Sequence, residues 1–334
     1  MVGMVRIRVE RSLDLDRQRR GMAQSDTQSK TMKIAYLILA HRNPRLIART
    51  IEALSCEDSA FFVHIDKKSN LNEFLVIKAK NVLFTERRIP VYWAEYSMVE
   101  AILILIQQAL VESKKYEYFI LLSGSDYPLR SKEYISRFFD QRRGTEFINL
   151  TLLPNVEAGL PLSKINTISI RSDQPALRLL AKACAKLGLA QRDYRKHLPN
   201  LQPYGGSTWW ALTRSACQYI IDFTKDNTRV CEYFAKTHTS DETFFHTILG
   251  NSVFRRRSQR CLMYDDWGSA GPRHPIMLNS SHLDFFEAHQ QVMIDDAFGA
   301  GEVLFARKFS DQTLDFLNRL DDIIRAKDTR TLTS

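Results

Sequence analysis

Residues 34–44 have the sequence Ile34-Ala-Tyr-Leu-Ile-Leu-Ala-His-Arg-Asn-Pro44, an unbroken apolar run that ends in polar residues. A run of this kind is typical of a strand buried on both faces, as in a parallel sheet. A helix is predicted over 45–55, where apolar residues recur at helical spacing: Leu46, Ile47, Ile51 and Leu54. A second apolar run covers 60–65 and ends at Asp66. This alternation predicts one α/β domain with a mostly parallel central sheet and helices on both faces.

Polar side chains follow three of the predicted strands. His41 and Arg42 follow the first and Asp66 the second, and the strand over 118–122 breaks at Ser123-Gly-Ser-Asp-Tyr-Pro128. Between them we expect a short strand over 91–93 and a helix over 98–113 capped by Ser97. Ligands of open α/β sheets bind beyond the carboxyl ends of the strands. Residues 32–150 are therefore predicted to form a nucleotide-binding half.

The second half, 151–330, is less regular and shows no repeat or linker. The expected elements are a strand over 147–150, an amphipathic helix over 175–190, a turn leading into a strand over 204–212, helices over 214–224 and 228–236, a helix over 241–249 capped by Ser240, and a helix over 311–327. Residues 1–31 are polar, without apolar periodicity after Val9, and are predicted to be a disordered tail.

The composition is that of an ordinary soluble globular protein, with 334 residues, 44% hydrophobic and 25% charged. No apolar run is long enough to span a membrane, and the N-terminus lacks the apolar block of a secretory signal. The five cysteines are odd in number and show no Cys-x-x-Cys spacing. This pattern argues against a disulfide framework and a zinc site, and favours a reducing, cytoplasmic location.

The formal net charge of +9 is unevenly distributed along the chain. Residues 1–31 carry seven basic and four acidic groups, and residues 171–198 carry seven basic and two acidic groups. The remainder is close to neutral, which disfavours a nucleic-acid partner. The helix within 171–198 has basic residues on one side and leucines on the other. It is either a solvated core helix or a peripheral contact with an anionic membrane surface.

Two charged pairs are candidates for chemistry. Asp241 and Glu242 stand at a predicted helix start, where carboxylates commonly complement the helix dipole. The alternative is that one of them acts as a general base for an attacking hydroxyl. Arg307 and Lys308 lie in a short apolar stretch, either as a solvated turn or as fixed cations for a departing diphosphate.

Aromatic and acidic residues near these pairs give weaker signals. Trp209, Trp210 and Trp267 are candidates for stacking on sugar, although buried tryptophans are more often core. In a strand, Trp209 and Trp210 would face opposite ways. Ser207 lacks the Gly-x-Ser-x-Gly context of a nucleophile. The one clear Asp-x-Asp sequence, at 14–16, lies in the predicted tail, and the lack of a better placed one favours basic side chains over a metal ion as the source of positive charge.

Seven short motifs of this sequence match those of a known family. They lie at 35–44, 64–69, 121–128, 206–210 (Gly-Ser-Thr-Trp-Trp), 240–245 (Ser-Asp-Glu-Thr-Phe-Phe), 266–267 (Asp-Trp) and 304–309 (Leu-Phe-Ala-Arg-Lys-Phe). Together and in this order they resemble the core-2/I-branching β-1,6-N-acetylglucosaminyltransferase family, which also includes the peptide O-xylosyltransferases. The resemblance implies a GT-A-like fold over 32–330, an acceptor and catalytic half over 151–330, inversion at the anomeric carbon, and a UDP-sugar donor without metal or other cofactor.

The resemblance also implies roles for particular residues. Glu242 takes the position of the base, with Asp241 beside it, and Lys308 that of the diphosphate-binding lysine, with Arg307 as a second cation. The remaining positions are the uridine pocket (Ala40, His41, Asp66) and the substrate side (Asp126, Ser207, Trp209, Trp210, Trp267). Asp126 matches an acidic position whose role is either structural or in substrate binding.

The chain departs from the animal branching enzymes, which carry a membrane anchor and disulfides. Those enzymes also bind the diphosphate through a second residue, an arginine. In this sequence Arg273 is the one candidate for that position. The resemblance implies a shorter, bacterial-type member acting on an envelope or exported polysaccharide, on a glycan or lipid-linked acceptor. N-acetylglucosamine is the favoured sugar, with xylose as the alternative. A non-catalytic sugar- or nucleotide-binding protein on the same scaffold is the competing class.

Overall fold

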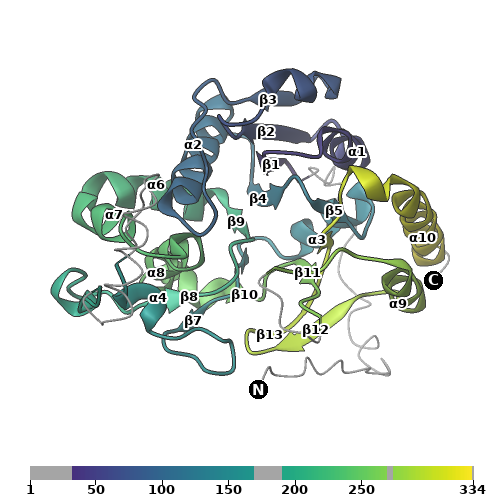
Figure 1. Cartoon of the computed structure of the whole chain (residues 1–334). Helices are drawn as coiled ribbons and strands as arrows, with labels where there is room; N and C mark the ends of the chain where they lie inside the picture. Colours follow the sequence, from purple (N-terminus) through teal and green to yellow (C-terminus); the bar gives the residue numbers. More distant parts are fainter. Residues whose placement is uncertain (1–31, 169–189, 269–273, 333–334) are drawn as a thin grey trace, which may run out of the picture.

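A computed structural model describes residues 32–168, 190–268 and 274–332 (Figure 1). The predicted tail over 1–31, residues 175–189 of the predicted helix over 175–190, and the candidate Arg273 lie outside the described residues. Within the described ranges, no helix is both long and apolar enough to cross a membrane.

The central sheet has the strand order β10-β6-β9-β4-β1-β2-β3. Its strands are β1 (Ile34–Ala40), β2 (Ser59–Ile65), β3 (Val82–Phe84), β4 (Tyr118–Ser123), β6 (Glu146–Phe147), β9 (Ala211–Thr213) and β10 (Ser258–Gln259). The β1 strand pairs in parallel with β2 and β4, and β2 pairs in parallel with β3. The β9 strand is antiparallel to both β4 and β6. The expected mostly parallel sheet is confirmed, and both halves of the chain contribute strands to it.

The apolar runs form strands because both of their faces are covered. Every residue of β1 and β2 is buried. Helix α2 (Tyr96–Glu112) packs on β1 and β2, and also on α6 (Arg214–Asp226). Figure 1 shows α2 and α6 on one side of the molecule, away from α1 (Pro44–Leu54) and α10 (Leu314–Leu332). Burial of complete strands accounts for the near-continuous apolar runs in the sequence.

A smaller sheet extends the ligand edge of the central sheet. Its order is β11-β14-β5, with β11 (Met263–Asp265) parallel to β14 (Phe305–Arg307) and β14 antiparallel to β5 (Asp126–Pro128). The β5 strand follows β4 after one tight turn, so β14 ends close to the carboxyl end of β4. This places the Arg307–Lys308 pair at the expected edge.

The remaining elements surround these two sheets. They are α3 (Lys132–Gln141), α4 (Ser163–Asn166), α7 (Thr228–Phe234), α8 (Phe244–Gly250), α9 (Ser280–Ala288), β7 (Thr151–Leu152), β8 (Tyr204–Gly205), β12 (Met293–Asp296), β13 (Gly299–Glu302) and the 3-10 turns η1 (Leu71–Val76), η2 (Tyr194–Lys196), η3 (Ser240–Glu242), η4 (Val253–Arg257) and η5 (Asp311–Thr313). The predicted helices over 45–55, 214–224, 228–236 and 311–327 are confirmed as α1, α6, α7 and the η5–α10 segment, with small shifts of their ends.

The predicted strand over 91–93 is wrong, because the fourth parallel strand is β3 at Val82–Phe84. Residues 91–93 lead into a turn before α2. The Ser97 hydroxyl does not cap α2, which begins at Tyr96 after Glu95; it accepts a hydrogen bond from Tyr92 N at 2.9 Å. The serine therefore fixes the turn before the helix.

The predicted helix over 241–249 is interrupted at its start. Residues Ser240–Glu242 form the 3-10 turn η3, and α8 begins only at Phe244. Thr239, before this turn, has left-handed backbone geometry with φ 54°, and the Ser240 hydroxyl has no partner among the described residues. The predicted strand over 204–212 is likewise split into β8 and β9, with Trp209 and Trp210 between them.

Candidate active site

The carboxyl ends of the parallel strands converge as predicted. Asp66 N donates to Ala40 O at 2.8 Å, and Gly124 N donates to Leu39 O at 2.9 Å. Asp66 is buried and accepts from Lys68, through Lys68 N at 2.9 Å and through an ion pair with Lys68 Nζ at 2.9 Å. His41 is exposed at the same edge. Ala40, His41 and Asp66 are therefore neighbours, and Lys68 joins them.

Gly124 allows the backbones at this edge to approach closely. A Cβ atom at this position would lie 3.0 Å from Ile47 Cδ1 and 3.1 Å from Arg42 O. Asn43, whose φ is 61°, donates from its side chain to Gly124 O at 2.9 Å. The loop after β1 and the turn after β4 are thereby held together as one surface.

Lys308 reaches the same surface from β14. Its neighbour Phe309 N donates to Ser125 O at 2.8 Å, which fixes the end of β14 against the turn after β4. Burial, reinforced by the positive charges of Arg307 and Arg42, lowers the pKa of Lys308. The cation is therefore partly desolvated and lies near a second arginine, Arg42, at the end of β1.

Asp126 is directed toward Arg307 and away from solvent. Its side chain is fully buried, and Oδ1 lies 3.2 Å from Arg307 Nε. It also accepts from Ser123 N and Ser123 Oγ, both at 2.6 Å. Burial raises the pKa of Asp126, opposed first by the charge of Arg307. Of the two roles considered for this acidic position, the geometry favours the structural one.

Arg307 is enclosed by the groups around it. Its side chain is 12% exposed, and its guanidinium lies 4.2 Å from the centroid of the Trp209 ring, a cation–π contact. Burial raises the pKa of Asp265, and the positive charge of Arg307 opposes this rise. With an aromatic ring and two carboxylates around it, Arg307 is placed to support Lys308 more than to bind a ligand by itself.

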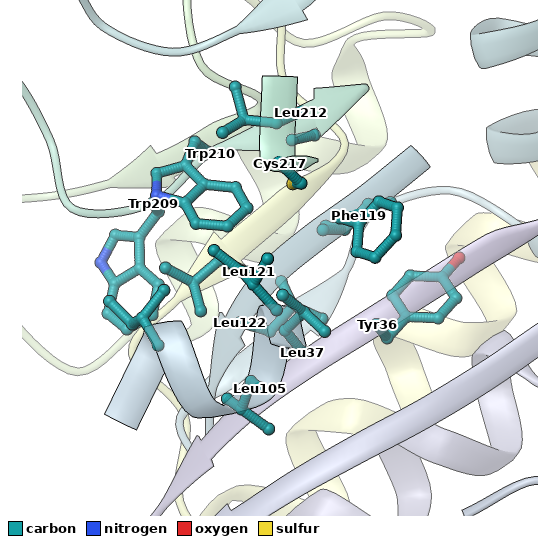
Figure 2. Packing of buried hydrophobic residues seen from close by; sticks show 14 of the residues in the cluster. Tyr36, Leu37, Leu105, Phe119, Leu121, Leu122, Trp209, Trp210, Leu212 and Cys217 are labelled. Carbon is teal, nitrogen blue, oxygen red and sulfur yellow. The ribbon is translucent and has the colours of Figure 1, made fainter. Parts of the chain in front are cut away.

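The two adjacent tryptophans have different surroundings. Trp210 is buried in the main core, where its ring meets Phe245 edge-on at 5.8 Å. Figure 2 shows Trp209 and Trp210 beside Leu121 in the same cluster. Trp209 is also buried but carries Arg307 over its ring. The structure therefore favours core packing for Trp210 and a link to the cationic pair for Trp209.

The segment 206–210 connects this cationic region to the Asp241–Glu242 pair. Gly206 N donates to Glu242 O at 3.0 Å, and Thr208 Oγ1 donates to Asp241 Oδ2 at 2.7 Å. A Cβ atom at Gly206 would lie 1.7 Å from Asn149 O, so only glycine fits there. Ser207 contributes its carbonyl oxygen, 2.9 Å from His246 Nε2. One short segment thus contacts the carboxylate pair at one end and Arg307 at the other.

Asp241 and Glu242 differ sharply in environment. Asp241 is buried, and its Oδ1 has no hydrogen-bond partner among the described residues. Burial, followed by the charge of Glu242, raises the pKa of Asp241 to about 6. Glu242 has a side chain 31% exposed, and its Oε2 is paired with Lys164 Nζ. Glu242 is therefore the more exposed carboxylate of the two.

Trp267 is the exposed aromatic residue of the predicted set, with 47% of its surface accessible. Burial raises the pKa of Asp265. The charges of Arg307 and Arg260 oppose this rise most, and a hydrogen bond with the Trp267 side chain opposes it further. Asp266 is fixed separately, with Oδ2 2.9 Å from His282 Nε2. Trp267 therefore lies on the Arg307 side of the site.

Two basic residues of the site were not singled out from the sequence. Lys164 belongs to a segment without periodicity, and no spacing relates it to Glu242, 78 positions away. Lys68 lies two residues after Asp66, beyond the end of β2. Its position after a buried strand was an available signal.

Comparisons with known proteins show the family of this chain. The family described as Core-2/I-Branching enzyme matches residues 34–288. Xylosyltransferase 2 of Canis lupus familiaris is 28% identical over 238 residues, which is 69% of this chain and 26% of that protein. Human xylosyltransferase 1 is 25% identical over 228 residues, which is 66% of this chain and 22% of that protein. The match thus spans about a quarter of these relatives.

Among solved structures, mouse xyloside xylosyltransferase 1 in its apo form aligns with 82% of this chain and 97% of its own. Its TM-score is 0.33 at 12% identity, too low to bear on function.

The fold is a mostly parallel α/β sheet, and the family match covers most of the chain that forms it. The chain belongs to the Core-2/I-Branching enzyme family.

Proposed function

We propose that this protein transfers a sugar from a UDP-sugar to a hydroxyl group of a glycan acceptor, with inversion and without a metal ion. The observation that carries the proposal is the 206–210 segment, which contacts Glu242 through Gly206 N at 3.0 Å and Arg307 through the Trp209 ring at 4.2 Å. A base and a cationic region held by one rigid segment are what a single displacement requires.

In the proposed reaction, Glu242 accepts the proton of the acceptor hydroxyl as its oxygen bonds to the anomeric carbon. The bond from that carbon to the diphosphate breaks, and UDP leaves with the electron pair. Lys308, supported by Arg307, stabilises the negative charge that develops on the diphosphate oxygen. The surface made by Ala40, His41 and Asp66 is proposed to hold the uridine, and Trp267 to contact the acceptor.

Two observations bear on the donor sugar, and they point to different sugars. The motif resemblance favours N-acetylglucosamine, whereas the relatives reported above are xylosyltransferases by name. UDP-xylose is therefore the second candidate donor. An envelope or exported polysaccharide is the proposed acceptor class.

Glu242→Gln tests the proposed base. The variant keeps the size of the side chain but cannot take up a proton, so transfer should fall by a factor of about 10² to 10⁴. UDP binding, measured as thermal stabilisation, should remain close to that of the wild type. Near-normal turnover in this variant would show that Glu242 is not the base.

Metal independence is tested separately. Wild-type turnover should be unchanged by excess EDTA, because Lys308 and Arg307 are proposed to supply the positive charge. A strict requirement for Mn²⁺ or Mg²⁺ would contradict this part of the proposal and leave the base assignment open to its own test.

A further inference from the structure

The carboxylate of Glu242 is held by a lysine from a distant part of the chain. Lys164 Nζ pairs with Glu242 Oε2, and the two side chains are 22% and 31% exposed. Among the described residues, Glu242 Oε1 has no hydrogen-bond partner. One carboxylate oxygen is thus occupied by a fixed cation, and the other is open.

Lys164 projects from a rigid support. Its neighbour in α4, Ile165, is completely buried, and Ile165 O accepts a hydrogen bond from the Tyr233 hydroxyl at 2.7 Å. Thr167 N donates to Ser163 O at 3.2 Å and closes the short helix. The position of the lysine backbone is therefore set by core packing, and its side chain spans a fixed distance to Glu242.

The backbone of Glu242 is equally fixed. Glu242 N donates to Thr239 O at 3.1 Å, and Glu242 O accepts from Gly206 N at 3.0 Å. These bonds fix the main chain but leave the side-chain torsions free. Within the described part of the chain, the ion pair with Lys164 is the contact that restrains the carboxylate group itself.

Among the described residues, no neighbouring group replaces this cation at neutral pH. His238 is the other basic side chain described near Glu242, and partial burial followed by the charge of Lys164 lowers its pKa, so its ring is neutral. Asp241 is buried and carries the same sign of charge as Glu242. The orientation of the Glu242 carboxylate therefore depends on Lys164.

We infer that Lys164 is a positioning residue for the base, a role that rests on the proposed function. By binding Oε2, the lysine turns Oε1 toward the position of the attacking hydroxyl. The proton of that hydroxyl passes to Oε1, while the ammonium group keeps its own protons and remains paired with Oε2. The lysine neither donates a proton nor touches the donor sugar.

Donor hydrolysis separates this role from simple acceptor binding, because water replaces the acceptor. UDP release from UDP-xylose and from UDP-N-acetylglucosamine is measured for the wild type, Lys164→Met and Lys164→Arg. Lys225→Met is the matched control, since Lys225 forms an exposed pair with Asp222 on α6.

We expect Lys164→Met to lower kcat for hydrolysis about 10- to 100-fold, a part of what a general base contributes. The donor KM should stay within about twofold, and Lys164→Arg should retain most of the activity because it keeps the charge. The control should match the wild type. The inference would be overturned if Lys164→Met hydrolysed the donor at the wild-type rate. It would also be overturned if Lys164→Arg lost as much kcat as Lys164→Met.

A measurement without substrate tests the pair itself. Melting temperatures are compared for the wild type, Glu242→Gln, Lys164→Met and the double variant. If the two side chains interact, the changes are not additive; additive changes would show that the pair does not form. Should Glu242→Gln keep its turnover, the proposed base fails, while this cycle still reports on the pair.

Discussion

Arg307 lies between Trp209 and Asp126, with its guanidinium 4.2 Å from the Trp209 ring centroid and its Nε 3.2 Å from Asp126 Oδ1. This relationship joins the small sheet, which carries Arg307, to the segment that leads to Asp241 and Glu242. The arginine is enclosed on both sides, so its neighbour Lys308 is the better placed cation for a ligand. The geometry therefore separates an enclosed cation, Arg307, from the neighbouring Lys308, which is the one proposed to bind the diphosphate.

Replacing Asp126 by Asn should destabilise the protein. The substitution leaves Arg307 buried beside a neutral partner, and breaking a buried ion pair in this way costs about 3–5 kcal/mol. Urea unfolding would measure the loss. Asp222→Asn, in an exposed pair on α6, is the control and should leave stability unchanged within error. Equal stabilities for the two variants would argue against the enclosed pair.

Replacing Lys308 by Met should reduce turnover by a factor of about 10² to 10³, the usual effect of removing one fixed group that stabilises developing charge. Binding of UDP should weaken as well, because the diphosphate is charged in the bound state. Steady-state kinetics and a UDP titration would measure both effects, with Lys225→Met as the control. Unchanged UDP affinity would place the diphosphate elsewhere.

The buried carboxyl of Asp241 should make stability depend on pH. Its pKa is raised from 3.8 to about 6 in the folded protein, so the folded state binds more protons than the unfolded state between these values. The stability due to this proton is fully present below about pH 4 and is lost as the pH rises through 6. At pH 7 the wild type therefore buries a charge that Asp241→Asn does not.

The measurement is the difference in unfolding free energy between Asp241→Asn and the wild type at pH 4 and at pH 7. The difference should move in favour of the variant as the pH rises, by at most about 3 kcal/mol at 1.36 kcal/mol per pKa unit. Comparing the two proteins cancels the titration of other buried groups, such as His64 and His246. A difference independent of pH would indicate that Asp241 ionises normally.

For the basic segment 171–198, most of which lies outside the described residues, contact with an anionic membrane surface stays a prediction, alongside that of a solvated core helix. If it binds an anionic surface, the protein should float with vesicles containing phosphatidylglycerol, and deletion of the segment should abolish this. Binding should weaken with salt, because the attraction is electrostatic. Failure of the intact chain to float would leave the solvated core helix as the better interpretation.

The parts of the fold that could be predicted are those that local patterns encode. The runs at 34–40, 60–65 and 118–122 predicted their strands because complete burial leaves an uninterrupted apolar sequence. The strand over 82–84 was missed because it is short and only half-buried. The helix over 241–249 was predicted too long because nothing in its sequence marks the left-handed Thr239 that interrupts its start.

The candidate site was predictable where its residues follow strands or lie in recognisable motifs. Glu242, Lys308, His41 and Asp66 were selected in this way. Lys164 was not, and the structural role of Asp126 could not be distinguished from substrate binding. In both cases the deciding fact is a partner distant in the sequence, and no local spacing contains it.

By itself, the sequence determined that a mostly parallel sheet forms, that its ligand edge carries polar residues, and that the motifs are those of one glycosyltransferase family. These features depend on burial and on short segments, which local sequence controls. Only the tertiary structure decided that Glu242 is paired with Lys164 and that Arg307 is enclosed by Asp126 and Trp209. The physical reason is that the charge and exposure of each carboxylate depend on which distant side chains the packed core brings beside it.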